Sequence, residues 1–219
     1  MKKICGLGNL IKGDNMKKEE VIKLDIACGQ NIQEGFVGMD IHPGKDVKYV
    51  GDILDFWSEK SPWKKIKDNS VDEIVCNMFV EHIPHIIEGH GMKHGFDDCF
   101  YLFFDEIYRI LKPATFKEDN PSIPISGFAK FITPYYSSIR CWQDPTHTRA
   151  ISEASFLYLN AKWREMNRLD HYPIKANFDY FYAYNLDADL VNRNQEFQGK
   201  AIKSENNAAS DIITTVFKR

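Results

Sequence analysis

Near the start of the chain, Gly29 and Asp40 have the types and spacing of a nucleoside-binding site. The apolar run from Val21 to Ala27 predicts a buried strand that Gly29 ends, and residues 35–41 predict a second short strand ending near Asp40. A glycine lets the backbone approach a ligand closely, and a carboxylate at the end of the second strand can accept hydrogen bonds from both ribose hydroxyls. This layout predicts a nucleoside site on an open α/β sheet.

The same segment resembles the signature of the class I S-adenosylmethionine-dependent methyltransferases. Asp25 matches the acidic residue and Gly29 the retained glycine, whereas Ala27 and Asn31 stand where a fuller pattern has glycines. Only ten residues separate Gly29 from Asp40, fewer than a helical crossover usually needs. We therefore expect the first helix to be shortened or absent, as in a compact, methyltransferase type 11-like subgroup whose substrates are largely unassigned.

The resemblance implies an α/β fold, a Rossmann-like, seven-stranded, mostly parallel sheet with an antiparallel last strand. It also implies S-adenosyl-L-methionine as cofactor. Asp52 and Ile53 follow a short third strand and match the place that contacts adenine, although Asp52 can also be a simple turn residue. Asn77 and Met78 end a fourth strand over residues 71–79 and match neighbours of the methyl group. The implied cofactor site consists of Asp25, Ala27, Cys28, Gly29, Asp40, Ile41, Asp52, Ile53, Asn77 and Met78.

Two histidines are candidate catalytic residues on the acceptor side. His82 follows the fourth strand, beside Glu81, and His147 lies in the loop 135–149 after a fifth strand over 127–134. Both can serve as a general base, which methyl transfer needs only when the acceptor is a hydroxyl or a protonated amine. We expect this loop, with Tyr135, Trp142 and Arg149, to form an acceptor pocket; the alternative is a loop fixed by Asp144 to Arg149 or to the backbone.

Four histidines and three glycines occur between residues 82 and 95. Their spacing matches no zinc motif, so we predict a lid-like loop over 82–95 and no metal site. Residues 114–126 contain two prolines and are expected to form an exposed, dispensable inserted loop.

Further along the chain, periodicity predicts a helix over 96–111 and another after Ser152. The second helix should bury Phe156, Leu159, Trp163 and Met166. Strands are expected over 177–185 and 211–219, antiparallel to each other. Residues 187–210 show no helical pattern and are expected to form a polar connection.

The 219 residues predict one methyltransferase domain over 21–219 after an extension of residues 1–20. The formal net charge of −3 disfavours nucleic acid as a partner, and no apolar run approaches the roughly 18 residues that span a membrane. Five cysteines without a C-x-x-C pair favour a reduced, cytoplasmic protein. The expected function is methyl transfer to a small molecule or saccharide. A non-catalytic cofactor-binding protein, a nucleic-acid methyltransferase and an oxidoreductase using Gly6 and Gly8 are the alternatives; the oligomeric state is open.

Overall fold

A computed structural model describes residues 21–86 and 98–219 of the chain. The predicted extension 1–20, with Gly6 and Gly8, and most of the predicted lid 82–95 lie outside these residues. Seven of the described strands form one sheet in the order β3-β2-β1-β4-β7-β9-β8. Their bounds are β1 Lys23–Ile26, β2 Val37–Asp40, β3 Val47–Val50, β4 Glu73–Asn77, β7 Phe128–Pro134, β8 Phe178–Leu186 and β9 Ala209–Lys218.

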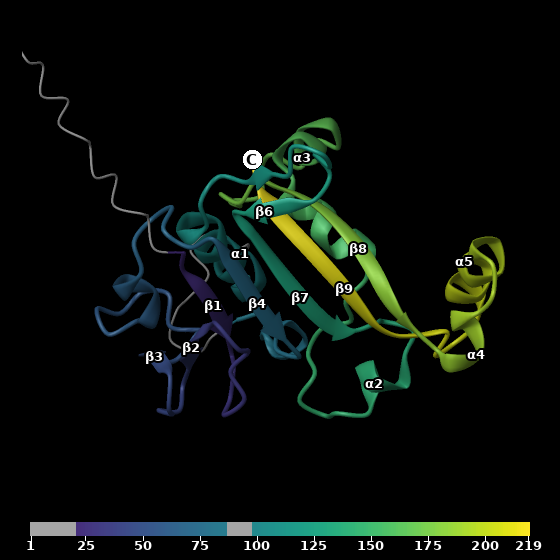
Figure 1. Ribbon diagram of the computed structural model, residues 1–219, viewed down its shortest axis with the longest axis horizontal. Helices are drawn as coiled ribbons and strands as arrows, with labels where there is room; N and C mark the ends of the chain where they lie inside the picture. Colours follow the sequence, from purple (N-terminus) through teal and green to yellow (C-terminus); the bar gives the residue numbers. More distant parts are fainter. Residues whose placement is uncertain (1–20, 87–97) are drawn as a thin grey trace, which may run out of the picture.

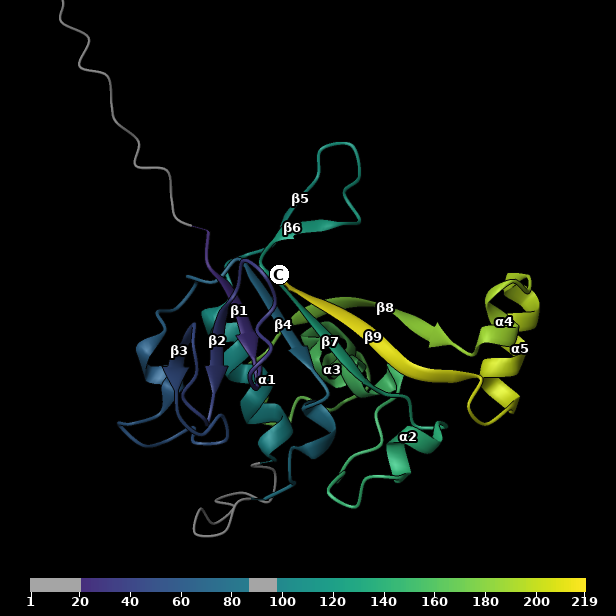
Figure 2. The same cartoon turned by 60° about the horizontal axis from the view of Figure 1, so that its bottom comes forward.

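The direction of the strands confirms the predicted fold class. The strands β3, β2, β1, β4 and β7 are mutually parallel, whereas β9 is inserted between β7 and β8 and runs antiparallel to both (Figure 1). Residues 27–36 join β1 to β2 through turns without a helix, as the short spacing predicts. Parallel neighbours end at the same edge, so β1, β2 and β4 bring their carboxyl ends together (Figure 2).

The main helix, α1 (Cys99–Ile110), carries an apolar face onto the sheet. Asp98 caps it by accepting a hydrogen bond from the Phe100 amide, and Phe104 packs against Phe131 of β7 with ring centroids 5.0 Å apart. Phe103 and Ile107 are fully buried beside it. This helix covers one face of the sheet near the carboxyl ends of the strands.

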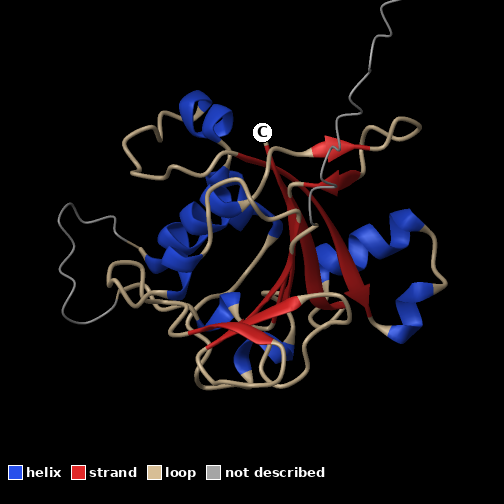
Figure 3. Cartoon of the chain, turned by 60° about the vertical axis from the view of Figure 1, so that its left-hand side comes forward, coloured by secondary structure: helices blue, strands red, loops and turns tan. Residues whose placement is uncertain are grey.

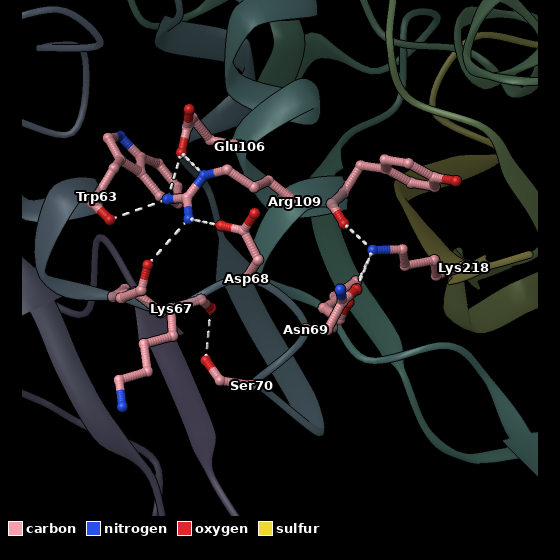
Figure 4. A network of polar contacts seen from close by, with 11 residues as sticks. Trp63, Lys67, Asp68, Asn69, Ser70, Glu106, Arg109 and Lys218 are labelled. Atoms are coloured by element: carbon pink, nitrogen blue, oxygen red, sulfur yellow. Dashed lines mark hydrogen bonds and ion pairs between the residues drawn. The ribbon is translucent and has the colours of Figure 1, made fainter.

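The far end of α1 is tied to two distant segments by cations (Figure 4). Arg109 donates to the carbonyls of Trp63 and Ile66, which fixes the short 3₁₀ helix η1 (Pro62–Lys65). Lys218 at the end of β9 donates to the carbonyls of Tyr108 and Leu111. These contacts lie at the opposite end of the sheet from the carboxyl edge and are structural.

The inserted loop 114–126 is ordered differently from its prediction. It forms a hairpin of β5 (Thr115–Phe116) and β6 (Pro124–Ser126), seen apart from the main sheet in Figures 2 and 3. The tip is exposed as expected, but the Ser126 hydroxyl donates to Asp72 at 2.9 Å, so the base is anchored. Gly127 follows with φ +74°, and a Cβ there would lie 2.5 Å from the Lys112 carbonyl oxygen.

The predicted helix after Ser152 is broken into the 3₁₀ helix η3 (Glu153–Leu159) and α3 (Ala161–Met166). Asn160 adopts an extended conformation and caps α3, so α3 is rotated relative to η3. Phe156 and Leu159 of η3 are buried as expected. In α3, by contrast, Trp163 is half-buried and Met166 is 74% exposed, contrary to the prediction. Arg164 is buried instead and donates to the three main-chain carbonyls of Tyr158, Ile174 and Ala176.

The connection between β8 and β9 is also helical, where the prediction had none. It contains α4 (Ala188–Val191) and α5 (Gln195–Ser204), which lie beyond the end of β8 (Figure 1). Within α5 only Ala201 is buried, so the helix has almost no apolar stripe that periodicity could detect. A third short helix, α2 (Ile139–Trp142), lies in the loop after β7.

Candidate functional site

The loop after β1 is held by the two acidic residues that the sequence singled out. The Gly29 amide donates to Asp40 Oδ2 and the His42 amide to Asp40 Oδ1, both at 2.9 Å. The Gln33 amide donates to Asp25 Oδ2 at 2.8 Å. A carboxylate has about four lone-pair sites, so Asp40 keeps accepting capacity on both oxygens after these two bonds. Asp25 is 4% exposed and supports the loop from below; its pKa is raised by burial, which the Gln33 amide partly offsets.

The backbone is strained where β1 and β4 end side by side. Ala27 has φ 55° and Met78 has φ 52°, a region that residues with a side chain seldom adopt. Gly29 continues the turn with φ 55°. Strained residues of this kind cost on the order of 1–3 kcal/mol each and are concentrated at ligand sites. Two of them on adjacent strand ends make this edge a candidate ligand site.

Gly38 on β2 makes room for the loop that faces it. A Cβ at Gly38 would lie 2.7 Å from Cys28 Sγ and 2.8 Å from Ile32 Cδ1, which is too close for either atom. The Cys28 thiol thus packs against the strand. Burial, together with the charges of Asp25 and Asp40, raises the pKa of Cys28 to about 11, so the thiol is neutral and serves packing and not nucleophilic chemistry.

The remaining predicted cofactor residues lie around this loop with varied exposure. Asp52 is exposed and accepts from the Leu54 amide at 2.9 Å, so it does form the turn considered as its alternative role. Ile53 is buried, and its carbonyl accepts from Trp63 Nε1 at 2.7 Å. Ile41 and Asn77 are exposed at the ends of β2 and β4.

The acceptor loop 135–149 folds back onto the segment after β4. The amides of Thr148 and Arg149 donate to the Glu81 carbonyl at 2.9 and 3.2 Å, which joins the loop to the 3₁₀ helix η2 (Val80–His82). The Arg149 guanidinium pairs with Asp98 and lies over the Phe100 ring at 5.3 Å. Arg149 thus fixes the loop to α1, and its partner is Asp98 where the sequence suggested Asp144.

The two candidate histidines lie side by side although they are 65 positions apart in the sequence. Their ring centroids lie 4.6 Å apart in an edge-to-face arrangement. His147 Nδ1 lies 3.0 Å from the Cys141 carbonyl, which can only accept, so Nδ1 carries the proton. The Thr146 hydroxyl donates to Asp144 at 2.7 Å and therefore accepts from His82 Nδ1 at 3.0 Å. In the neutral form of each ring the lone pair then lies on Nε2, and His147 Nε2 is 3.9 Å from Asp144 Oδ2.

Glu81 completes this group from the buried side. It is 1% exposed, and neither of its carboxylate oxygens has a hydrogen-bond partner among the described residues. Burial raises the pKa of Glu81 to about 7; its own nearby backbone N–H, which does not reach hydrogen-bond geometry, and His147 oppose this shift. Burial and the neighbouring His147 lower the pKa of His82. One ligand atom from each of Glu81, His82 and His147 lies within 4.8 Å of the others.

The predicted acceptor pocket is formed only in part. Tyr135 is 2% exposed and donates to Glu153 at 2.9 Å, so it is structural, as is Arg149. Trp142 is 68% exposed and lines a groove of about 340 Å³ with Tyr136 and Ile139. Arg149 also lines a separate cavity of about 310 Å³ with Tyr101 and Tyr158, whereas the His147 side chain is 9% exposed.

None of the helices within residues 21–86 and 98–219 is both long and apolar enough to cross a membrane.

No protein-family model matches the chain, and no curated protein matches it. Similar solved structures include phosphoethanolamine N-methyltransferase 2 from Haemonchus contortus with S-adenosyl-L-methionine (13% identity, 90% of this chain and 48% of that chain, TM-score 0.41). The small RNA methyltransferase HEN1 is similar at 14% identity over 91% of this chain and 23% of that chain, with TM-score 0.43. An S-adenosylmethionine-dependent methyltransferase from Mesorhizobium loti is similar at 12% identity over 90% of this chain and 91% of that chain, with TM-score 0.45. The chain thus spans about half or less of the first two proteins, and similarity of this degree identifies neither a substrate nor a family.

Proposed function

We propose that this protein transfers a methyl group from S-adenosyl-L-methionine to a small-molecule or saccharide acceptor. The observation that carries the proposal is the loop after β1, where Asp40 binds the Gly29 amide beside the strained residues Ala27 and Met78. This arrangement presents a carboxylate with accepting capacity next to closely turned backbone. Such a pair suits a ribose and the groups attached to it.

The residues at this edge fit a nucleoside cofactor. Asp40 accepts hydrogen bonds from ribose hydroxyls, while Gly29 leaves open space above its backbone, with no atom within 4 Å of a Cβ built there. Asp52 and Ile53 sit in the turn that follows β3 and serve the adenine. The bound cofactor supplies an activated sulfonium methyl, so the protein's main task is to position donor and acceptor in line.

The acceptor approaches from the side of His82 and His147. In the neutral form each ring has its lone pair on Nε2, because each Nδ1 donates a hydrogen bond, and in that form either nitrogen can take a proton from an acceptor hydroxyl or ammonium group. The exposed Trp142 offers an apolar face to a sugar or another small ring. The overall charge of −3 favours such an acceptor over a nucleic acid.

Ligand-dependent stabilisation tests the cofactor part of the proposal. S-adenosylhomocysteine at about a hundred times its dissociation constant should raise the free energy of unfolding by roughly 2.7 kcal/mol, and NAD should have no effect. Asp40→Asn should weaken binding about tenfold or more, because a charge-assisted hydrogen bond is worth roughly 1.5–3 kcal/mol. Asp119→Asn, at the exposed hairpin tip, is the matched control and should bind normally. Stabilisation by NAD alone would contradict the proposal.

Catalysis needs a separate test because the acceptor is unidentified. Labelled methyl transfer from the cofactor into fractionated cell extract should mark a small, protease- and nuclease-resistant product. His147→Ala should reduce this transfer about a hundredfold while cofactor affinity stays within about twofold. Cofactor binding without transfer to any fraction would instead support the non-catalytic binding protein, and a nuclease-sensitive product would support a nucleic-acid methyltransferase.

A further inference from the structure

We propose that Glu81, His82 and His147 bind a divalent transition-metal ion at the acceptor side of the crevice. Use of the ion in methyl transfer rests on the proposed function, whereas binding of the ion does not. The inference begins with proximity, since one carboxylate oxygen and one nitrogen from each ring lie within 4.8 Å of one another. The ligand atoms of a bound ion lie about 3–3.5 Å apart when each bond is about 2.0–2.2 Å, so modest side-chain movement closes the set.

The burial of Glu81 is the second, independent observation. Its side chain is 1% exposed, and both oxygens lack a hydrogen-bond donor among the described residues. A buried carboxylate without a partner is costly, and such groups are normally paired or coordinate metals. The nearby cation Arg140 is already engaged, because its guanidinium pairs with Asp211 at 2.9 Å. A metal ion held against the two imidazoles would supply the positive charge that Glu81 lacks.

The hydrogen bonds behind the two histidines are those of metal ligands. A ligating histidine usually donates its other ring N–H to a carbonyl or, directly or through another group, to a carboxylate, which fixes the ring and its tautomer. His147 Nδ1 donates to the Cys141 carbonyl, and His82 Nδ1 donates to Thr146, which donates in turn to Asp144. In these tautomers Nε2 carries the lone pair of each neutral ring, so an ion at Nε2 needs no change of tautomer; His147 Nε2 lies 3.9 Å from Asp144 Oδ2.

The donor set selects the class of ion. Imidazole suits zinc, iron, cobalt and nickel, whereas magnesium and calcium prefer sites made of oxygen atoms. Two histidines and one carboxylate are also the ligands of several catalytic zinc sites, in which a further position stays open. With an ion bound, both Nε2 lone pairs are engaged, so the ion would take the place of a free imidazole base: an acceptor hydroxyl bound to it would lose its proton more readily. The spacing of residues 82–94 did not predict this site, because its third ligand comes from the loop after β7.

Metal binding can be measured without knowing the acceptor. Tag-free protein is stripped with a chelator, and zinc or cobalt(II) chloride is titrated by calorimetry and by the visible absorption of cobalt. Wild-type protein should bind one equivalent in the micromolar range or tighter, and magnesium chloride should bind far more weakly. Glu81→Gln and His147→Ala should each weaken zinc binding at least tenfold. The matched control is His171→Ala, which removes a histidine outside the cluster and should leave zinc binding unchanged.

Circular dichroism and S-adenosylhomocysteine affinity are measured on the same samples. If His147→Ala loses its fold, His82→Ala provides the same test, because it removes another residue of the same cluster. Zinc and cobalt binding that is absent, or equally strong in Glu81→Gln and in the histidine variants, would overturn the metal site. Metal binding without S-adenosylhomocysteine binding would refute the proposed function and leave the metal site standing, and the reverse result would refute the metal site alone.

Discussion

Replacing Gly38 with alanine should damage the cofactor loop without unfolding the sheet. A Cβ at this position would lie 2.7 Å from Cys28 Sγ and 2.8 Å from Ile32 Cδ1, whereas ordinary contacts are 3.4 Å or longer. Either the two side chains or the loop must move by several tenths of an ångström. Overpacking of this kind costs about 1–3 kcal/mol, and the flexible end of Ile32 places the expected cost near the lower half of that range.

The energetic cost should appear mainly as a loss of ligand affinity, because this loop places the Gly29 amide in hydrogen-bond contact with Asp40. Gly38→Ala should weaken S-adenosylhomocysteine binding roughly five- to thirtyfold, corresponding to about 1–2 kcal/mol. Calorimetric titration measures the affinity, and urea unfolding measures the accompanying loss of stability.

A double-mutant cycle with Cys28→Ala identifies the source of the effect, because it removes the sulfur that the new methyl group meets. The double variant should regain at least half of the affinity lost in Gly38→Ala. Unchanged affinity and stability in Gly38→Ala, or no recovery in the double variant, would refute the conclusion that Gly38 makes room for the Cys28 and Ile32 side chains of this loop.

Three further predictions concern stability. Arg164→Met should lower the free energy of unfolding by about 3–4 kcal/mol in urea, because three buried carbonyls lose their donor, whereas Lys162→Met on the exposed side of the same helix should change it by less than about 0.5 kcal/mol. Burial raises the pKa of Asp105 from 3.8 to about 6 despite hydrogen bonds from two amides. The folded state therefore binds the Asp105 proton more tightly than the unfolded state does. The contribution of Asp105 to the free energy of unfolding should accordingly fall as the pH rises from about 4 to 6, and Asp105→Asn should reduce this pH dependence in thermal melts across that range. Replacing residues 117–123 with a short turn should leave the thermal midpoint unchanged, whereas removing all of 114–126 should lower it, because Ser126 then no longer bonds to Asp72. An unchanged midpoint after the longer deletion would restore the sequence-based expectation that the whole insertion is dispensable.

The parts of the fold that the sequence predicts are those with strong local signals. Apolar runs located β1, β2 and β4, the second of them ending in Asp40, and the short spacing between Gly29 and Asp40 predicted the missing helix. The helix α4 was missed because it has only four residues, and α5 because it buries only Ala201 and so has no apolar stripe. Likewise, Asn160 breaks the helix after Ser152 by capping α3, and nothing in the apolar periodicity marks the break. The burial of Arg164 depends on carbonyls that only the folded chain brings together.

The same difference between local signals and contacts made only on folding divides the candidate site into two halves. The cofactor half is built from contacts within a short stretch, as when Asp40 binds the amide of Gly29 eleven residues away. The acceptor half depends on a main-chain contact between Thr148 and Glu81, which are 67 residues apart. Residue types therefore made His82 and His147 candidates, but only tertiary packing shows that the two rings lie together beside a buried carboxylate. Because Arg149 fixes the acceptor half to Asp98 at the start of α1, changes in that helix cap can alter the acceptor side while the cofactor loop keeps its own hydrogen bonds.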